Sequence, residues 1–227
     1  MNFAYIVYLK LKELGVSDVK IGSYVPRWFV FSILTGRYSS SPESAFDFDI
    51  KQIANKDFGQ ILSEYEEAEL SDAFWNFSLP QSLDTSVASS PYFNVYLAAQ
   101  VKANDKGFLS KDVLVSNLIE LRGDIHHLFP KDYLKKNGLE RGMYNQIANY
   151  VYMQSEINIK VGNKPPEEYF QKVLDEMEKQ SKTLSGISNM VELENNLRVN
   201  CIPSEIINMK IDNYEHFLNA RRRLMAD

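Results

Sequence analysis

The chain has 227 residues, of which 44% are hydrophobic, and it contains 13 Phe and 13 Tyr. This composition excludes a disordered protein, and the length suffices for one large domain or two small ones. The single cysteine, Cys201, excludes an internal disulfide and a cysteine-based zinc site, and it fits a reducing cytoplasm. The formal net charge of −5 argues against DNA binding by the whole surface, but it is compatible with a local basic patch.

No segment predicts contact with a membrane. The apolar runs are shorter than the ~20 residues that a transmembrane helix needs. The N-terminal stretch MNFAYIVYLKLKELG lacks the basic start and the small-residue cleavage site of a signal peptide, and its apolar spacing is that of an amphipathic helix. We therefore expect a cytoplasmic protein without a membrane span.

The first half of the chain predicts a succession of helices. Residues 79–91 are rich in Ser and Pro and indicate a loop, and residues 112–122 fit either a helix or a strand. Gly15 and Gly36 each act as a stop signal after an apolar stripe. The predicted helices cover residues 5–14, 26–34, 44–55, 57–66, 70–77 and 91–104.

The pattern changes at Leu121. DIHHLFP (124–130) is too short for a helix and ends at a proline, and residues 131–142 are charged and turn-like. Residues 149–162 alternate in a way that suits a strand or a hairpin, and NKPPEEYFQKVLDEMEKQ (163–180) predicts a helix with prolines in its first turn. The remaining helices are expected at about 187–198, 203–209 and 213–226. The predicted fold class is mainly α, with a strand–loop–strand–helix unit inside a helical chain.

Two of the three histidines, His126 and His127, are adjacent. On an extended strand they would point to opposite sides, so that one could hold a metal ion while the other faces substrate. Asn149 follows 22 residues after His127, and Asn158 follows nine residues later. An imidazole and an amide oxygen with open positions suit a divalent metal ion, and a second imidazole can deprotonate water. These groups together suffice for metal-assisted phosphodiester hydrolysis.

The strings HHLFP, IANYVYM and INIKVGNKPPEEYF resemble the HNH (His-Me finger, ββα-metal) nuclease motif. The chain as a whole is similar to the C-terminal HNH domain of GmrSD-type proteins, which are modification-dependent type IV restriction and phage-defence enzymes. PRWFVFSILTGRYSSSPES upstream and CIPSEI and NYEHFLNARRRLMA downstream extend the similarity to nearly the whole chain. The resemblance implies a small ββα-metal unit within a helical domain.

The resemblance assigns a role to four residues. It implies that His127 is the general base, that His126 and Asn158 are metal ligands, and that Asn149 braces the loop that holds the base. The metal would be a divalent ion, Mg²⁺ in the cell, with Mn²⁺, Ni²⁺ or Zn²⁺ as alternatives. Asp124 is a candidate for a second contact to an imidazole.

Basic residues around the motif are candidates for contact with the phosphate backbone of DNA, although an ordinary solvated loop explains them nearly as well. These candidates are Lys131, Arg141, Lys160 and Lys164. The run from Arg221 to Arg223 lies on a predicted terminal helix, where pairing and solvation are the simpler interpretation and DNA contact is the alternative.

The resemblance also implies partners. These are DNA, including modified phage DNA, and an N-terminal nucleotide-hydrolysing domain whose DGQQR-like motif does not occur in this sequence. The expected division is a helical region at 1–118, the HNH unit at 119–180 and closing helices at 181–227 that pack with the first region.

Three functional hypotheses follow. The first is an HNH endonuclease or nickase. The second is a catalytically silent HNH-like module that binds DNA or a partner. The third, a structural metal site at the histidine pair, ranks last because too few ligands are nearby for a closed tetrahedral site.

Overall fold

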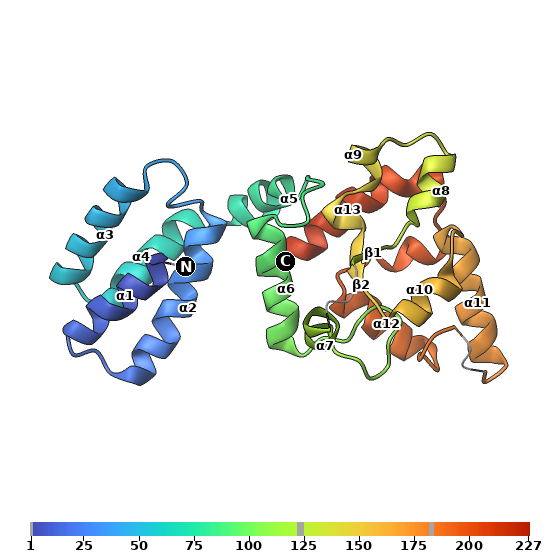
Figure 1. The fold of residues 1–227 in the computed structure, drawn as a ribbon, viewed down its shortest axis with the longest axis horizontal. Coiled ribbons are helices and arrows are strands. Elements are labelled where there is room, and N and C mark those ends of the chain that lie inside the picture. The colour runs from blue at the N-terminus through green and yellow to red at the C-terminus, as the bar shows by residue number, and fades with distance from the viewer. Residues whose placement is uncertain (1, 122–124, 182–183) are drawn as a thin grey trace. The chain divides into compact units, whose positions relative to one another are not determined.

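The computed structural model describes residues 2–121, 125–181 and 184–227, and it confirms a mainly helical fold (Figure 1). The chain divides into two compact units, Met1–Leu79 (unit 1) and Pro80–Asp227 (unit 2). The division lies at residues 79–80 and not at residue 118. Residues 80–118 belong with the closing helices, and the hydrogen bond from the Tyr96 hydroxyl to the carbonyl of Asn200 (3.1 Å) is one of the contacts that join them.

Unit 1 is built from helices that start at clear N-terminal signals. The side chain of Asp57 accepts a hydrogen bond from the amide of Gln60 (3.1 Å), and Pro42 occupies the first turn of its helix. The elements of unit 1 are α1 (Asn2–Glu13), α2 (Asp18–Leu34), α3 (Pro42–Asn55), α4 (Phe58–Glu69) and a π-helical turn η1 (Phe74–Ser78).

Helix α2 is longer than the sequence predicted. It begins at Asp18 and runs through Pro26, the residue at which the predicted helix 26–34 starts. A proline inside a helix removes one hydrogen bond and crowds the carbonyl four residues earlier. That residue is Gly22, which has no Cβ and gives the backbone freedom to adjust.

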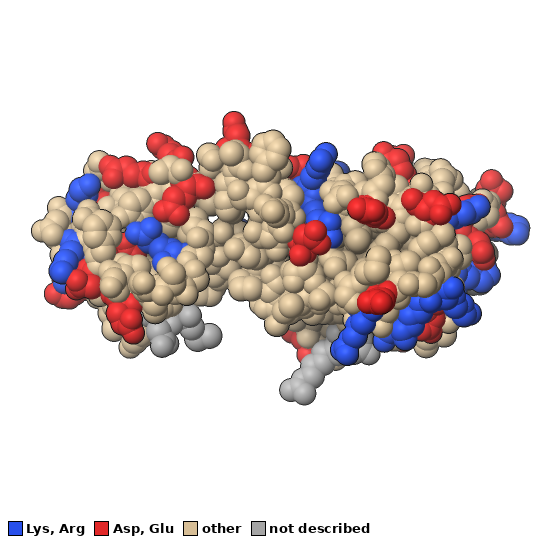
Figure 2. Space-filling model, turned by 90° about the horizontal axis from the view of Figure 1, so that it is seen from above, with Lys and Arg blue, Asp and Glu red and all other residues tan. Residues whose placement is uncertain are grey.

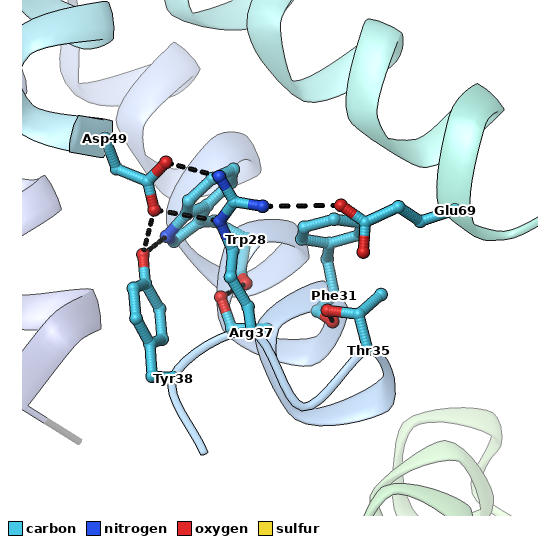
Figure 3. Close-up of polar contacts among 8 residues, drawn as sticks. Trp28, Phe31, Thr35, Arg37, Tyr38, Asp49 and Glu69 are labelled. Atoms are coloured by element: carbon cyan, nitrogen blue, oxygen red, sulfur yellow. Dashed lines mark hydrogen bonds and ion pairs between the residues drawn. The ribbon is translucent and has the colours of Figure 1, made fainter. Parts of the chain in front are cut away.

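A buried ion pair lies against the aromatic core of unit 1 (Figure 3). Arg37 donates to Asp49 through Nε (2.8 Å) and Nη2 (2.5 Å), and Asp49 also accepts a hydrogen bond from the Tyr38 hydroxyl (2.8 Å). The guanidinium lies 4.4 Å from the centre of the Tyr65 ring and 5.4 Å from that of Trp28. Arg37 follows α2 and Asp49 lies on α3, so the pair fixes the turn between these helices.

Unit 2 surrounds a short two-stranded sheet with helices (Figure 1). Its elements before the second strand are α5 (Leu79–Ser82, which crosses the division), α6 (Pro91–Ala103), α7 (Val115–Glu120), β1 (Ile125–His127), α8 (Lys131–Lys136), α9 (Arg141–Tyr144) and η2 (Ile147–Asn149). The later elements are β2 (Tyr150–Tyr152), α10 (Ser155–Val161), α11 (Pro166–Glu178), α12 (Met190–Val199), η3 (Ser204–Asn208), η4 (Ile211–Asn213) and α13 (Tyr214–Ala226).

Strands β1 and β2 pair antiparallel, with Ile125 opposite Tyr152 and His127 opposite Tyr150. Three expectations are corrected around this pair. The turn-like segment 131–142 contains helix α8 and the start of α9, the expected loop at 79–91 contains α5, and the predicted strand or hairpin at 149–162 is strand only at β2. Residues 155–161 form helix α10, because Ile157 and Val161 are buried one helical turn apart.

The closing helix α13 packs directly behind β1 and η2. The ring of Phe129 lies 5.0 Å from that of Phe217 and 5.1 Å from that of Tyr214. The Tyr214 hydroxyl donates to the carbonyl of Met143 (3.0 Å). Among the helices that the structure describes, none combines the length and the hydropathy that crossing a bilayer would require.

Candidate active site

An open pocket of about 380 Å³ lies where β1, α8 and α10 meet. It brings together His126, His127 and Asn158, three of the four central residues that the sequence analysis singled out. Lys131 and Asp132 line the same pocket, at the first turn of α8. The remaining lining residues are Pro130, Ile159, Gly162 and Asn163.

The two histidines are neighbours on β1, where successive side chains alternate between the two faces of the strand. Both line the one pocket. A metal ligand and a base can therefore act on the same bound molecule.

The imidazole of His127 is held in a defined orientation. Its Nε2 lies 3.0 Å from Oδ1 of Asn145. An amide oxygen only accepts, so this contact suits the neutral tautomer that has its proton on Nε2 and its lone pair on Nδ1. The Tyr150 ring meets the imidazole edge-on, with 5.2 Å between ring centres.

Burial is the main reason that the pKa of His127 is lowered from its ordinary value of 6.5. The hydrogen bond between Nε2 and the Asn145 oxygen, which accepts it, opposes this effect, and the nearby Lys131 and His126 add to it. The neutral imidazole is therefore the form present at pH 7, which is the form that a general base needs.

Asn145 is not among the site residues predicted from the sequence. It is the residue that ends α9, and it contacts His127 across 18 positions of sequence. Its spacing in the sequence carries no signal for this role, because the contact depends on how α8 and α9 fold back over β1.

Asn149 is fully buried and links three segments. Its Oδ1 accepts from the amide of Phe129 (2.8 Å), and its Nδ2 donates to the carbonyls of Phe129 (3.1 Å) and Tyr144 (3.2 Å). Its own carbonyl accepts from the amide of Leu128 (2.9 Å). Asn149 does not line the pocket; it holds the residues that immediately follow the histidine pair.

The donor groups of the pocket fit a weakly held divalent ion. An imidazole from His126 and an amide oxygen from Asn158 leave several positions for water and substrate oxygens, and the carboxylate of Asp132 lies on the same pocket. Within the described ranges there is no group of three or more His, Cys, Asp and Glu side chains that could hold a metal ion. This donor set suits an open site and does not suit a closed structural zinc site.

The predicted DNA-binding residues are spread around the pocket. Lys131 lines it and lies over the Tyr144 ring (5.9 Å), and Lys160 is exposed on α10. Lys164 lies 4.0 Å from the Glu168 carboxylate, and Arg141 is exposed at the start of α9. Figure 2 shows basic side chains gathered, among acidic ones, toward the end of unit 2 where Figure 1 places α8 and α11. Asp124 lies outside the described residues.

The arginine run on α13 divides into three different environments. Arg221 is fully buried, and Arg222 is buried against Asp84 (2.5 Å) and Gln146 (3.1 Å). Arg223 is exposed. DNA contact by the first two is therefore excluded in this conformation. Of the simpler interpretation, pairing holds for Arg222 through Asp84, and solvation holds for neither.

Comparison with known proteins gives limited similarity. No family model and no solved structure matches the chain. Among curated proteins, the uncharacterized protein MJ0686 of Methanocaldococcus jannaschii is 26% identical over 161 residues, which make up 70% of this chain and 26% of that protein. The chain thus corresponds to about a quarter of the length of this relative.

Proposed function

We propose that the chain carries a metal-dependent HNH-type nuclease site that hydrolyses one phosphodiester bond of DNA. The observation that carries the proposal is the meeting of His126, His127 and Asn158 in one pocket, with Nε2 of His127 turned to Oδ1 of Asn145 at 3.0 Å. The order β1, β2, α10 is the order of elements expected for a ββα-metal unit, and it supports the same assignment.

In the proposed mechanism, Nδ1 of His127 takes a proton from a water molecule as the water oxygen bonds to phosphorus and the bond to the leaving oxygen breaks. His126 and Asn158 would hold a divalent ion, Mg²⁺ in the cell, which when bound supplies charge stabilisation at the scissile phosphate. Lys131, at the edge of the pocket, supplies a positive charge for the DNA backbone. One base and one metal position make one active centre, so a single chain nicks one strand.

The wider role extends this proposal. The resemblance of the sequence motifs implies that the site works as the C-terminal part of a modification-dependent restriction or phage-defence protein, alongside a nucleotide-hydrolysing domain. The similarity to an uncharacterized relative of about four times this length is compatible with a longer protein and carries no information on its role. A catalytically silent module that binds DNA or a partner is the alternative, and the net charge of −5 and the sparse donor set favour it.

The test is a supercoiled-plasmid nicking assay with Mg²⁺, Mn²⁺ or EDTA. We expect metal-dependent conversion to open circles, and a rate about 10²- to 10⁴-fold lower for His127→Ala. His216→Ala is the matched control, because His216 is exposed on α13 and lines a different pocket. Equal nicking by His127→Ala and wild type would refute the assignment of the base. DNA binding without nicking by either protein would favour the silent module.

A further inference from the structure

Arg221 is a fully buried cation on α13. Among the residues that the structure describes, no Asp or Glu forms an ion pair with it, and burial lowers its pKa. Burying a charge without a counter-ion costs free energy, so the hydrogen bonds of this guanidinium have to offset that cost.

Two of those hydrogen bonds go to the main-chain carbonyls on either side of Asn149. Nη1 donates to the carbonyl of Ala148 (2.9 Å) and to that of Tyr150 (2.7 Å), and Asn149 lies between them. Nη2 lies 3.3 Å from the carbonyl of Asn200, at the end of α12. A planar guanidinium can hold several carbonyls at once, which a lysine ammonium on a flexible stem does less rigidly.

The backbone that Arg221 holds includes the residues that position the segment around His127. Asn149 anchors Leu128 and Phe129, directly after the histidine pair, and Tyr150 is the pairing partner of His127. A shift of the backbone at 148–150 would move both supports of His127 together.

We propose that Arg221 is a positioning residue for the nuclease site and acts by clamping the backbone on both sides of Asn149. The inference rests on the proposed function for its catalytic consequence, whereas the clamp itself is independent of any activity. The clamp couples the closing helix α13 to the base, although Arg221 itself does not line the pocket.

The first test compares Arg221→Lys with Arg223→Lys, its exposed neighbour on the same helix, in the full chain. Amide hydrogen exchange reports the clamp. In Arg221→Lys we expect the protection of the Leu128 and Phe129 amides to fall at least about tenfold while the amides of unit 1 keep theirs. Arg223→Lys should match wild type. Unchanged protection of Leu128 and Phe129 in a folded Arg221→Lys protein would overturn the clamp.

Kinetics report the catalytic consequence. A misplaced base lowers kcat, by about 100-fold for a displacement near 1 Å, and leaves KM within about twofold. A purely structural defect would lower the fraction of active protein in step with unfolding, so both variants are assayed well below their unfolding temperatures. Loss of amide protection with unchanged kcat would overturn the positioning role. If wild type does not nick DNA, the proposed function fails, and the exchange result still decides the clamp.

If Arg221→Lys does not fold, Arg221→Ala with and without millimolar guanidinium ion replaces it. The ion should enter the space left by the side chain and restore protection of the Phe129 amide. A variant in which guanidinium restores no protection would overturn the proposal.

Discussion

The ion pair between Arg37 and Asp49 predicts a large and local loss of stability on Asp49→Asn. Asp49 is 2% exposed and accepts three hydrogen bonds, two from Arg37 and one from Tyr38. The substitution keeps the shape of the side chain but removes the charge, and it turns one acceptor into a donor that faces the guanidinium. The cation, whose side chain is 14% exposed, then stays buried without its main partner.

Breaking a buried pair in this way costs about 3–5 kcal/mol. A unit of this size has a total stability of roughly 4–12 kcal/mol, so the substitution removes a large part of it. The matched control is Asp47→Asn on the same helix, because Asp47 and Lys51 form an exposed pair with side chains 66% and 68% accessible. That control should cost less than about 0.5 kcal/mol.

Urea unfolding followed by tryptophan fluorescence measures the difference. Both tryptophans, Trp28 and Trp75, lie in unit 1, so the signal reports this unit alone. Trp28 also donates to the Tyr38 hydroxyl (3.2 Å) and so lies beside the ion pair itself. A midpoint for Asp49→Asn no lower than that for Asp47→Asn would refute the energetic role given to the pair.

Three further predictions concern unit 2. Asn149→Ala leaves the buried amide of Phe129 without its acceptor and should lower the free energy of unfolding of unit 2 by at least about 2 kcal/mol. Urea unfolding followed by far-ultraviolet circular dichroism measures this loss, and the tryptophan transition of unit 1 should stay unchanged. In the proposed mechanism the neutral form of His127 is the base, and burial lowers the pKa of this imidazole below 6.5. The nicking rate should therefore be flat from pH 7 to pH 8 and fall only as the pH drops below that ordinary value, and a rate that already halves between pH 8 and pH 7 would contradict this. Burial raises the pKa of the Cys201 thiol, so iodoacetamide should modify it more slowly at pH 7 than in urea-unfolded protein, and equal rates would contradict the burial.

The sequence was most informative where chemistry constrains residue types. The histidine pair and Asn158 do meet in one pocket, and Asn149 does brace the segment after the pair. The mainly helical fold also followed from apolar spacing. Alternation at 149–162 was misleading, because Ile159 is 76% exposed whereas Ile157 and Val161 are buried one turn apart, which is a helical pattern.

The rest depended on tertiary contacts that leave no trace in spacing. Asn145 reaches His127 only because α8 and α9 fold over β1. Arg221 looked like part of a solvated basic run, since a sequence does not show which arginine of three faces the core. The division at residue 79 was likewise missed, although the Ser- and Pro-rich segment 79–91 begins at this point.

The position of α13 behind the strands has a consequence for protein synthesis. The histidine pair leaves the ribosome long before the helix that supports it, since Phe217 and Arg221 come about 90 residues after His127. Unit 1, which has its own core, can fold as soon as it emerges. Because α13 supports the backbone beside the pocket, the pocket of unit 2 reaches its final form only after residue 221 is released, so a nascent or prematurely terminated chain would lack an ordered site.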